Sequence, residues 1–135
     1  MNRRALVATA IVAAAAPSTA LASGNADTLR RLIDEVVAAG DMSNLESIVS
    51  GNVTIAVLGI TDIDGFRAAS VEGAAARAEN YREHAFEVTS IAENEQWAHA
   101  LVRFTGEQVS GRKETRHVFY VAKFTDGLIS ELYLS

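Results

Sequence analysis

The stretch from Gly111 to Ser135 constrains the fold of this chain more than any other part of it. Residues 116–124 alternate between two faces, and Asp126-Gly127 separates them from a second alternating run that ends the chain. Asp-Gly between two such runs is a strong signal for a two-residue β-hairpin, because both central residues of the favoured turn need positive φ. We therefore expect a long strand, a tight turn and a returning strand.

The two faces of the predicted strands differ in composition. In residues 97–105 and 116–124, small or aliphatic side chains occupy alternate positions, which indicates one face covered by helices. Because small side chains leave space beneath a covering helix, we expect a pocket there, with the Tyr120 hydroxyl as its polar group. The small and aliphatic positions of this covered face are Ala98, Ala100, Val118, Ala122 and Leu132.

Three helices are predicted to precede the sheet. Residues 27–40 carry apolar side chains at three- and four-residue steps, with Asp27 as the N-cap. Residues 43–49 predict a second, short helix that begins with a Ser43/Glu46 capping box, and residues 61–80 predict a third. A short strand over residues 52–58 and a bulged strand after residue 81 complete the pattern. The chain is thus an α+β protein, with three N-terminal helices packed on a curved, mostly antiparallel sheet.

The first 22 residues are not expected to belong to this domain. Arg3-Arg4, an apolar run over residues 5–16 and the small residues of Ala20-Leu21-Ala22 have the order of a secretory signal peptide cut after Ala22. A membrane anchor and a first helix of the domain are the alternatives. Cleavage predicts an exported protein, periplasmic or secreted, with a single domain over residues 23–135.

The charge balance argues against two kinds of partner. Loss of two arginines with the leader lowers the basic residues from 12 to 10 against 17 acidic ones, so the formal net charge changes from −5 to −7. Nucleic acid and anionic lipid are bound through clustered Lys and Arg. We expect neither nucleic acid nor, for the mature form, a membrane as a partner.

Three short motifs carry a resemblance to a known family: Val37–Asp41, Ile63–Arg67 and Lys123–Ile129. In their order and spacing the chain resembles the nuclear transport factor 2-like superfamily, in particular its SnoaL-like and ketosteroid-isomerase-like members. The resemblance spans nearly all of residues 23–135. It implies a cone with an internal pocket between helices and sheet, which agrees with the pocket expected from the strand faces.

The catalytic residues of the resembled isomerases are mostly absent. Counted without gaps from Gly40-Asp41, the base aspartate falls on Val57, the oxyanion-binding tyrosine on Ile33 and the acid of the long strand on Tyr120. Proton abstraction beside a carbonyl needs a base and a donor to the developing enolate. A phenol with a pKa of about 10 can donate at neutral pH, but the base is missing.

Several residues have both a functional and a purely structural interpretation. Asp62 and Asp64 either replace the base at the pocket mouth or cap the third helix. Arg116, with Glu114, either clamps a ligand carboxylate or belongs to a solvated hairpin. Tyr120 is either a ligand contact or a buried ring whose hydroxyl bonds a backbone carbonyl. The residues predicted to contact a ligand are Tyr120, Val57, Ile33, Phe66, Val118, Ala100, Leu132 and Arg116.

No metal or cofactor is expected. The histidines His84, His99 and His117 lack the close spacing of a helical metal site, and the chain has no cysteine for a closed zinc site. Phosphate-cradling glycine loops, dinucleotide fingerprints and nucleophile motifs are also missing from the sequence.

The outer face of the predicted sheet is too apolar to stay wet on a small monomer. We therefore predict a homodimer through this face, as the resembled family often forms. The predicted interface comprises Trp97, His99, Leu101, His117, Phe119, Val121 and Tyr133, with Ile129 beside them.

Three functions stay open. The first is an exported protein that binds a small apolar molecule in the cone, with its polar end near Tyr120. The second is a lyase, isomerase or cyclase of the resembled type that uses Tyr120 with Asp62 or Asp64. The third is an interaction module whose pocket is packed shut. Because the base position is Val57, we predict the binding function.

Overall fold

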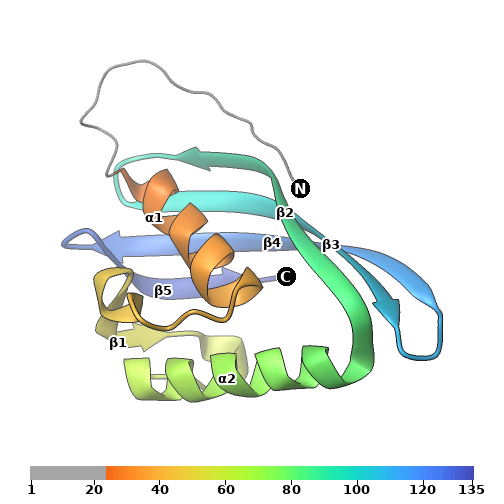
Figure 1. The fold of residues 1–135 in the computed structure, drawn as a ribbon. Coiled ribbons are helices and arrows are strands. Elements are labelled where there is room, and N and C mark those ends of the chain that lie inside the picture. The colour runs from red at the N-terminus through yellow and green to blue at the C-terminus, as the bar shows by residue number, and fades with distance from the viewer. Residues whose placement is uncertain (1–23) are drawn as a thin grey trace.

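The computed structural model describes residues 24–135, so the predicted signal peptide, residues 1–22, lies outside the described residues. The helices lie on one side of a five-stranded sheet, and the long β3–β4 hairpin extends beyond them (Figure 1). In chain order the elements are α1 Asn25–Arg31, η3 Leu32–Ala38, η4 Leu45–Ser47, β1 Val49–Thr54, η5 Ala56–Leu58, α2 Ile63–Asn80, β2 Tyr81–Glu93, β3 Trp97–Gln108, β4 Lys113–Thr125 and β5 Leu128–Leu134.

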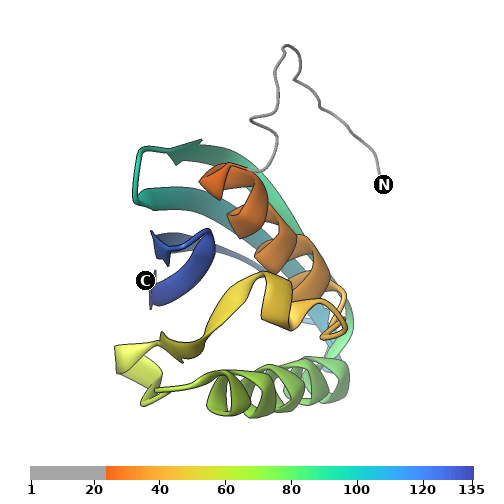
Figure 2. The same ribbon diagram turned by 90° about the vertical axis from the view of Figure 1, so that its left-hand side faces the viewer.

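The sheet has the strand order β1-β5-β4-β3-β2, with all neighbours antiparallel except β1 and β5. It curves strongly, and α1 and α2 lie on the same side of it (Figure 2). The predicted turn is confirmed, since Asp126 and Gly127 have φ values of 53° and 81°. The predicted bulge is confirmed too, because the β2–β3 register shifts between Val88 and Ser90.

The face predicted to be covered is the buried one. Ala98, Ala100, Val102 and Phe104 of β3 are all at most 1% exposed, which confirms the alternation read from the sequence. The prediction for Ile129 is wrong, because the sequence pattern predicts it on the outer face whereas it is fully buried. Lys123 pairs with Glu131 while Phe124 pairs with Ile129, so one extra residue in β5 turns Ile129 inward.

The first predicted helix is α1 continued by η3. η3 is a π-helix, in which each N–H donates to the carbonyl five residues earlier. The Ala39 N–H, for example, donates to the Asp34 carbonyl over 3.2 Å. It begins at Asn25, so Asp27 lies in the first turn and is not the N-cap. Gly40 follows with a φ of 68°, in its predicted role at the helix end. The apolar face is buried as expected: Leu29, Leu32, Ile33 and Val36.

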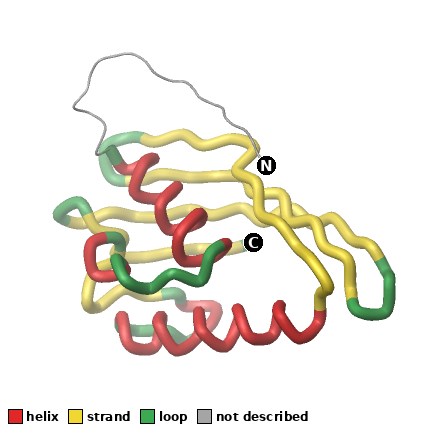
Figure 3. The backbone as a smooth tube through the Cα atoms, viewed as in Figure 1, coloured by secondary structure: helices red, strands yellow, loops and turns green. Residues whose placement is uncertain are grey.

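The second predicted helix is wrong, because residues 39–44 form a loop that leads to the single turn η4 (Figure 3). The capping box does not form: the Ser43 N–H and hydroxyl both donate to the Asp41 carboxylate, over 2.9 and 2.6 Å. Beyond the turn, the Ile129 N–H donates to the Ile48 carbonyl over 2.9 Å, and Val49 starts β1. Ile48 and Val49 thus bond to β5 and do not continue a helix.

The strand predicted over residues 52–58 is displaced. β1 ends at Thr54, and the chain then makes the turn η5, after which Gly59 has a φ of 70°. α2 begins where predicted, with Asp62 as the N-cap. Within residues 24–135 no helix combines the length and the apolar character that a membrane span requires.

Candidate functional site

A small pocket lies between η3, α2 and the inner face of the sheet. One part has a volume of about 120 Å³ and the adjoining part about 150 Å³, and they share Val37, Ala69, Ser70 and Tyr120. The first part is lined almost entirely by apolar side chains: Leu32, Ile55, Leu58, Ile60, Phe66, Leu132 and Leu134. The second part adds Val36, Gly73 and Arg77.

Tyr120 supplies the hydroxyl in the sheet wall of this pocket. It sits on β4 opposite Ala100 of β3 and Leu134 of β5, and it is 6% exposed. Burial raises the pKa of its phenol above the ordinary value, and the positive charge of Arg77 opposes this rise. The phenol therefore stays protonated at neutral pH and can donate. Among residues 24–135 its hydroxyl forms no hydrogen bond, so the predicted backbone carbonyl partner is not found there.

Arg77 supplies the charge in the helix wall. Its Nη2 donates to the Val37 carbonyl over 2.9 Å, which ties α2 to η3, and its guanidinium carbon lies 5.2 Å from the centroid of the Phe86 ring. The Nε atom is buried and has no hydrogen-bond partner among the described residues. Arg77 was not singled out from the sequence. Helical spacing could have found it, because the pocket residues of α2 are Phe66, Ala69, Ser70, Gly73 and Arg77.

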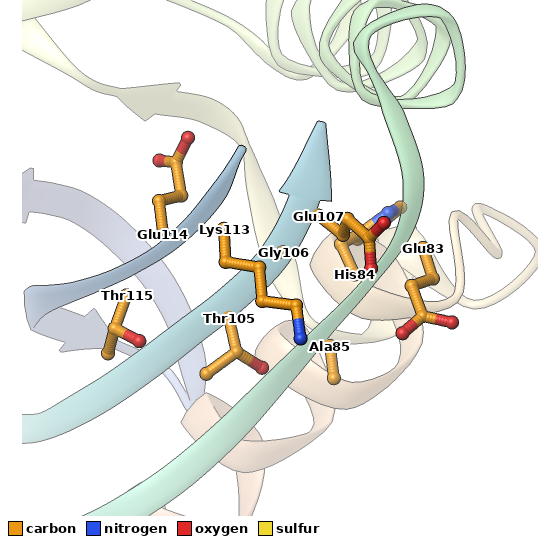
Figure 4. Close-up of a pocket in the computed structure, with 9 residues that line it drawn as sticks. All are labelled: Glu83, His84, Ala85, Thr105, Gly106, Glu107, Lys113, Glu114 and Thr115. Carbon is orange, nitrogen blue, oxygen red and sulfur yellow. The ribbon is translucent and has the colours of Figure 1, made fainter. Parts of the chain in front are cut away.

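A larger hollow of about 440 Å³ lies on the arm of the sheet formed by β2, β3 and the start of β4 (Figure 4). Its walls are strands alone, and Lys113 and Glu114 point to opposite faces of β4. The Glu114 carboxylate already accepts from Tyr81 Oη, Gln108 Nε2 and Arg116 Nε, over 2.8–2.9 Å. Because this key polar group is already paired, the hollow is a weaker site candidate than the smaller pocket.

The fold was compared with known proteins. Neither a protein-family model nor a curated protein sequence matches the chain. A SnoaL-like polyketide cyclase from Agrobacterium tumefaciens superposes with a TM-score of 0.66 at 17% identity, covering 82% of this chain and 89% of that one. An NTF2-like protein of unknown function from Burkholderia pseudomallei superposes with a TM-score of 0.62 at 14% identity, covering 82% of this chain and 88% of that one. TsrD from Streptomyces laurentii superposes with a TM-score of 0.64 at 18% identity, covering 80% of this chain and 87% of that one.

This chain has the SnoaL-like, nuclear transport factor 2-like fold. The resemblance read from three short motifs is thereby confirmed at the level of the fold. At these identities the likeness concerns the path of the chain alone, and it carries no activity with it.

Within this SnoaL-like fold, three of the predicted ligand contacts line the pocket: Tyr120, Phe66 and Leu132. Ile33 and Ala100 are buried in the core, and Val118 is partly buried against it, but none of these lines either part of the pocket. Val57 is 74% exposed on η5, while its neighbours Ile55 and Leu58 line the pocket instead. The gapless count placed Val57 on a strand, but β1 ends at Thr54 and Val57 lies in the turn η5.

The charged candidates lie away from the pocket lining. Asp62 is exposed and accepts from the Gly65 N–H over 2.8 Å as the N-cap of α2, and Asp64 is exposed in the first turn. Arg116 pairs with Glu114 over 2.8 Å and stacks on Phe104, 4.7 Å from the ring centroid, on the sheet arm. Within residues 24–135 no three His, Asp or Glu side chains gather as metal ligands would.

Proposed function

We propose that this protein binds a small, mainly apolar molecule in the pocket between η3, α2 and the sheet, with the polar end of the ligand at Tyr120. The observation that carries the proposal is a concave, apolar lining with one buried phenol that has no partner among residues 24–135. An apolar cavity of about 150 Å³ holds a molecule the size of benzene. With parts of about 120 and 150 Å³, the pocket suits a single ring or a short branched chain.

Catalysis of the isomerase or cyclase type is the second candidate. The shared fold with a SnoaL-like polyketide cyclase and the protonated Tyr120 phenol favour it. The position of the carboxylates speaks against it, because a general base must come within hydrogen-bond reach of its substrate. Asp62 is occupied as a helix cap, and neither Asp62 nor Asp64 lines the pocket.

The third candidate, a non-catalytic interaction module, would need neither a ligand nor a base.

The test is native mass spectrometry of the protein purified from its own host, followed by extraction and identification of any retained molecule. Titration of Tyr120→Phe with that molecule then measures the contribution of the phenol. We expect affinity to fall on the order of fivefold to tenfold, the effect of one neutral hydrogen bond. Tyr133→Phe, on the outer face, is the matched control and should keep full affinity.

Each outcome points to one candidate. Turnover of the retained molecule that stops in Tyr120→Phe while binding persists would establish catalysis. If no molecule is retained and none of toluene, benzamide or benzoate binds, the pocket does not serve a ligand and the interaction module is the better description.

We also propose that two copies associate through the outer sheet face. Trp97 stacks near Tyr133 at 6.2 Å between ring centroids, and His99 lies 5.7 Å from Phe119. Phe119 and Tyr133 are 39% and 45% exposed. A second copy brings the same aromatic surface, which a two-fold axis makes self-complementary. The other members of the proposed interface are Leu101, His117 and Val121.

Sedimentation velocity at micromolar concentration tests this association. A dimer is expected for the wild type and a monomer for Trp97→Glu, because a carboxylate would be buried in an apolar interface. Val109→Glu is the control, since Val109 is 56% exposed on the β3–β4 turn, outside the interface. A wild-type monomer would remove the proposal.

Export is proposed on the leader pattern of residues 1–22. Cleavage after Ala22 would leave every described helix and strand intact, because α1 begins at Asn25. Expression of the full chain in a bacterial host, followed by intact-mass measurement of the periplasmic fraction, should give the mass of residues 23–135. Recovery of only the full-length mass from the cytoplasm would count against export.

A further inference from the structure

Arg77 carries a partly buried positive charge that pairs with no carboxylate of the described chain. Five ion pairs form within residues 24–135, and none of them includes Arg77. A guanidinium has five N–H donors, yet the single hydrogen bond of Arg77 within these residues is the one to the Val37 carbonyl. Its Nε atom is buried without a partner. A guanidinium with unused donors is well suited to bind an anion through charge-assisted hydrogen bonds.

The same guanidinium borders the pocket. Arg77, Gly73 and Tyr120 all line its second part. The Arg77 Nη1 lies 3.5 Å from where a Cβ on Gly73 would stand, so the guanidinium extends back along α2 over a residue that has no side chain. The positive charge of Arg77 also opposes the rise that burial causes in the pKa of the Tyr120 phenol. The cation and the neutral donor thus converge on one small space.

We propose that the ligand of this pocket is a small carboxylic acid, whose carboxylate is held by the Arg77 guanidinium and the Tyr120 hydroxyl while its apolar body occupies the Phe66 and Leu132 side. This rests on the proposed binding function and names its ligand class. Guanidinium groups bind carboxylates through parallel, charge-assisted hydrogen bonds. A phenol adds a further donor, which a carboxylate can accept because each oxygen has two lone pairs.

A purely structural role would leave most of the guanidinium unexplained. Tying α2 to η3 uses one N–H of Arg77, and stacking on Phe86 uses the face of the group and none of its donors. Both contacts hold the guanidinium in place at the pocket wall. They position the group, and the remaining donors are left for a ligand.

The test compares two probes of the same shape on the wild-type full chain. Benzoate and benzamide differ in charge but hardly in size, and each can span the two adjoining pocket parts of about 120 and 150 Å³. Titration followed by backbone NMR shifts gives both dissociation constants, and shifts at residues of η3 and α2 locate the site. We expect benzoate to bind at least tenfold more tightly than benzamide, since hydrogen bonds to charged groups are the stronger ones.

Arg77→Met then removes the charge while keeping an unbranched apolar stem. The preference for benzoate over benzamide should disappear, with benzamide affinity changing less than threefold. Arg67→Met, on the same helix but outside the pocket lining, is the matched control and should keep the preference. Should Arg77→Met fail to fold, Arg77→Gln, which removes the charge but keeps N–H donors for the Val37 carbonyl, takes its place in the same comparison.

The outcomes separate this inference from the function on which it rests. If toluene and benzamide bind in the pocket and benzoate binds no better, the carboxylate proposal is overturned and the binding function stands. If benzoate is preferred equally by the wild type and Arg77→Met, another cation is responsible and the role of Arg77 is overturned. If none of the three probes binds and no molecule is retained from the host, both proposals fail.

Discussion

Arg77 and Arg116 lie on either side of one pair of packed rings, Phe86 and Phe104, whose centroids are 5.1 Å apart, and they have opposite surroundings. Each stacks on one of these rings, at 5.2 Å over Phe86 and 4.7 Å over Phe104. Arg116 also meets the Glu114 carboxylate over 2.8 Å, whereas Arg77 meets no carboxylate among residues 24–135. The arginine on the sheet arm is therefore paired within the described chain, and the arginine of the pocket is not. Unsatisfied polar groups in a native protein call for an explanation, and a ligand is the most direct one here.

The pocket and the sheet arm also differ in what covers them. The pocket has helices on one side and the sheet on the other, and Tyr120 in its wall is 6% exposed. The hollow on the arm has strands alone around it, although its volume is larger (Figure 4). Volume by itself is thus a poor guide to the functional site, because the same polar group has a stronger effect when it is desolvated.

The largest expected effect is on stability, at the base of the arm. Phe104 is 1% exposed and packs against the rings of Tyr81 and Phe86, so Phe104→Ala should lower the free energy of unfolding by about 3–5 kcal/mol. Urea unfolding followed by circular dichroism measures it. Val109→Ala, at 56% exposure on the β3–β4 turn and outside the proposed dimer interface, is the control and should cost far less. Similar losses for the two variants would mean that the arm has no aromatic core of its own.

Gly106→Ala is the next test of the arm. A Cβ at this position would stand 2.8 Å from Tyr81 Cδ1 and 3.1 Å from Phe104 Cζ, so the Tyr81 ring must shift and its hydrogen bond to Glu114 is disturbed. We expect a loss of about 1–3 kcal/mol in the free energy of unfolding. Gly51→Ala, where the added Cβ meets nothing within 4 Å, is the matched control. Equal stability of both variants would contradict the tight packing of this corner.

Asp62→Ala tests the start of α2, the helix that forms one wall of the pocket. Loss of the acceptor for the Gly65 N–H should cost about 1 kcal/mol of folding stability, measured by thermal or urea unfolding. Asp62→Asn keeps an N-cap oxygen and should restore most of it. If the protein proves to have turnover, Asp62→Asn separates two roles: a cap tolerates the amide, whereas a general base does not.

The smallest effect concerns pH. Hydrogen bonds from Gln108 and Tyr81, with a further one from Arg116, hold the pKa of Glu114 below its ordinary value. A carboxylate with a depressed pKa in the folded state stabilises it above the pKa of the unfolded chain, about 4.3, and this contribution is lost as pH falls through the folded-state pKa. The stability difference between the wild type and Glu114→Gln should therefore be present at neutral pH and vanish in acid.

Unfolding midpoints between pH 7 and pH 3 measure this difference. Glu83→Gln is the control, because the exposed Glu83 carboxylate accepts no hydrogen bond within residues 24–135. A difference between the wild type and Glu114→Gln that stayed constant with pH would show that the glutamine alters packing instead of charge.

Prediction from the sequence succeeded where the signal is local. The Asp126-Gly127 turn and the buried face of β3 follow from backbone conformation and from a period of two, so they were predicted correctly. The second helix was wrong because Ile48 and Val49 are used by the distant strand β5. Val57 was misplaced because the strand ends at Thr54, so that Val57 lies in the exposed turn η5.

What the amino-acid sequence determined by itself is the α+β character, the closing hairpin and the inward direction of Tyr120, because alternation and turn chemistry act between near neighbours. What the tertiary structure decided is which groups share the pocket. Arg77 lies 43 positions from Tyr120 in the chain, and nothing in its immediate sequence distinguishes it from Arg67 on the same helix. Packing of α2 against η3 and Phe86 brings one of these arginines, Arg77, to the pocket wall beside Tyr120, and such an environment exists only after the chain has folded.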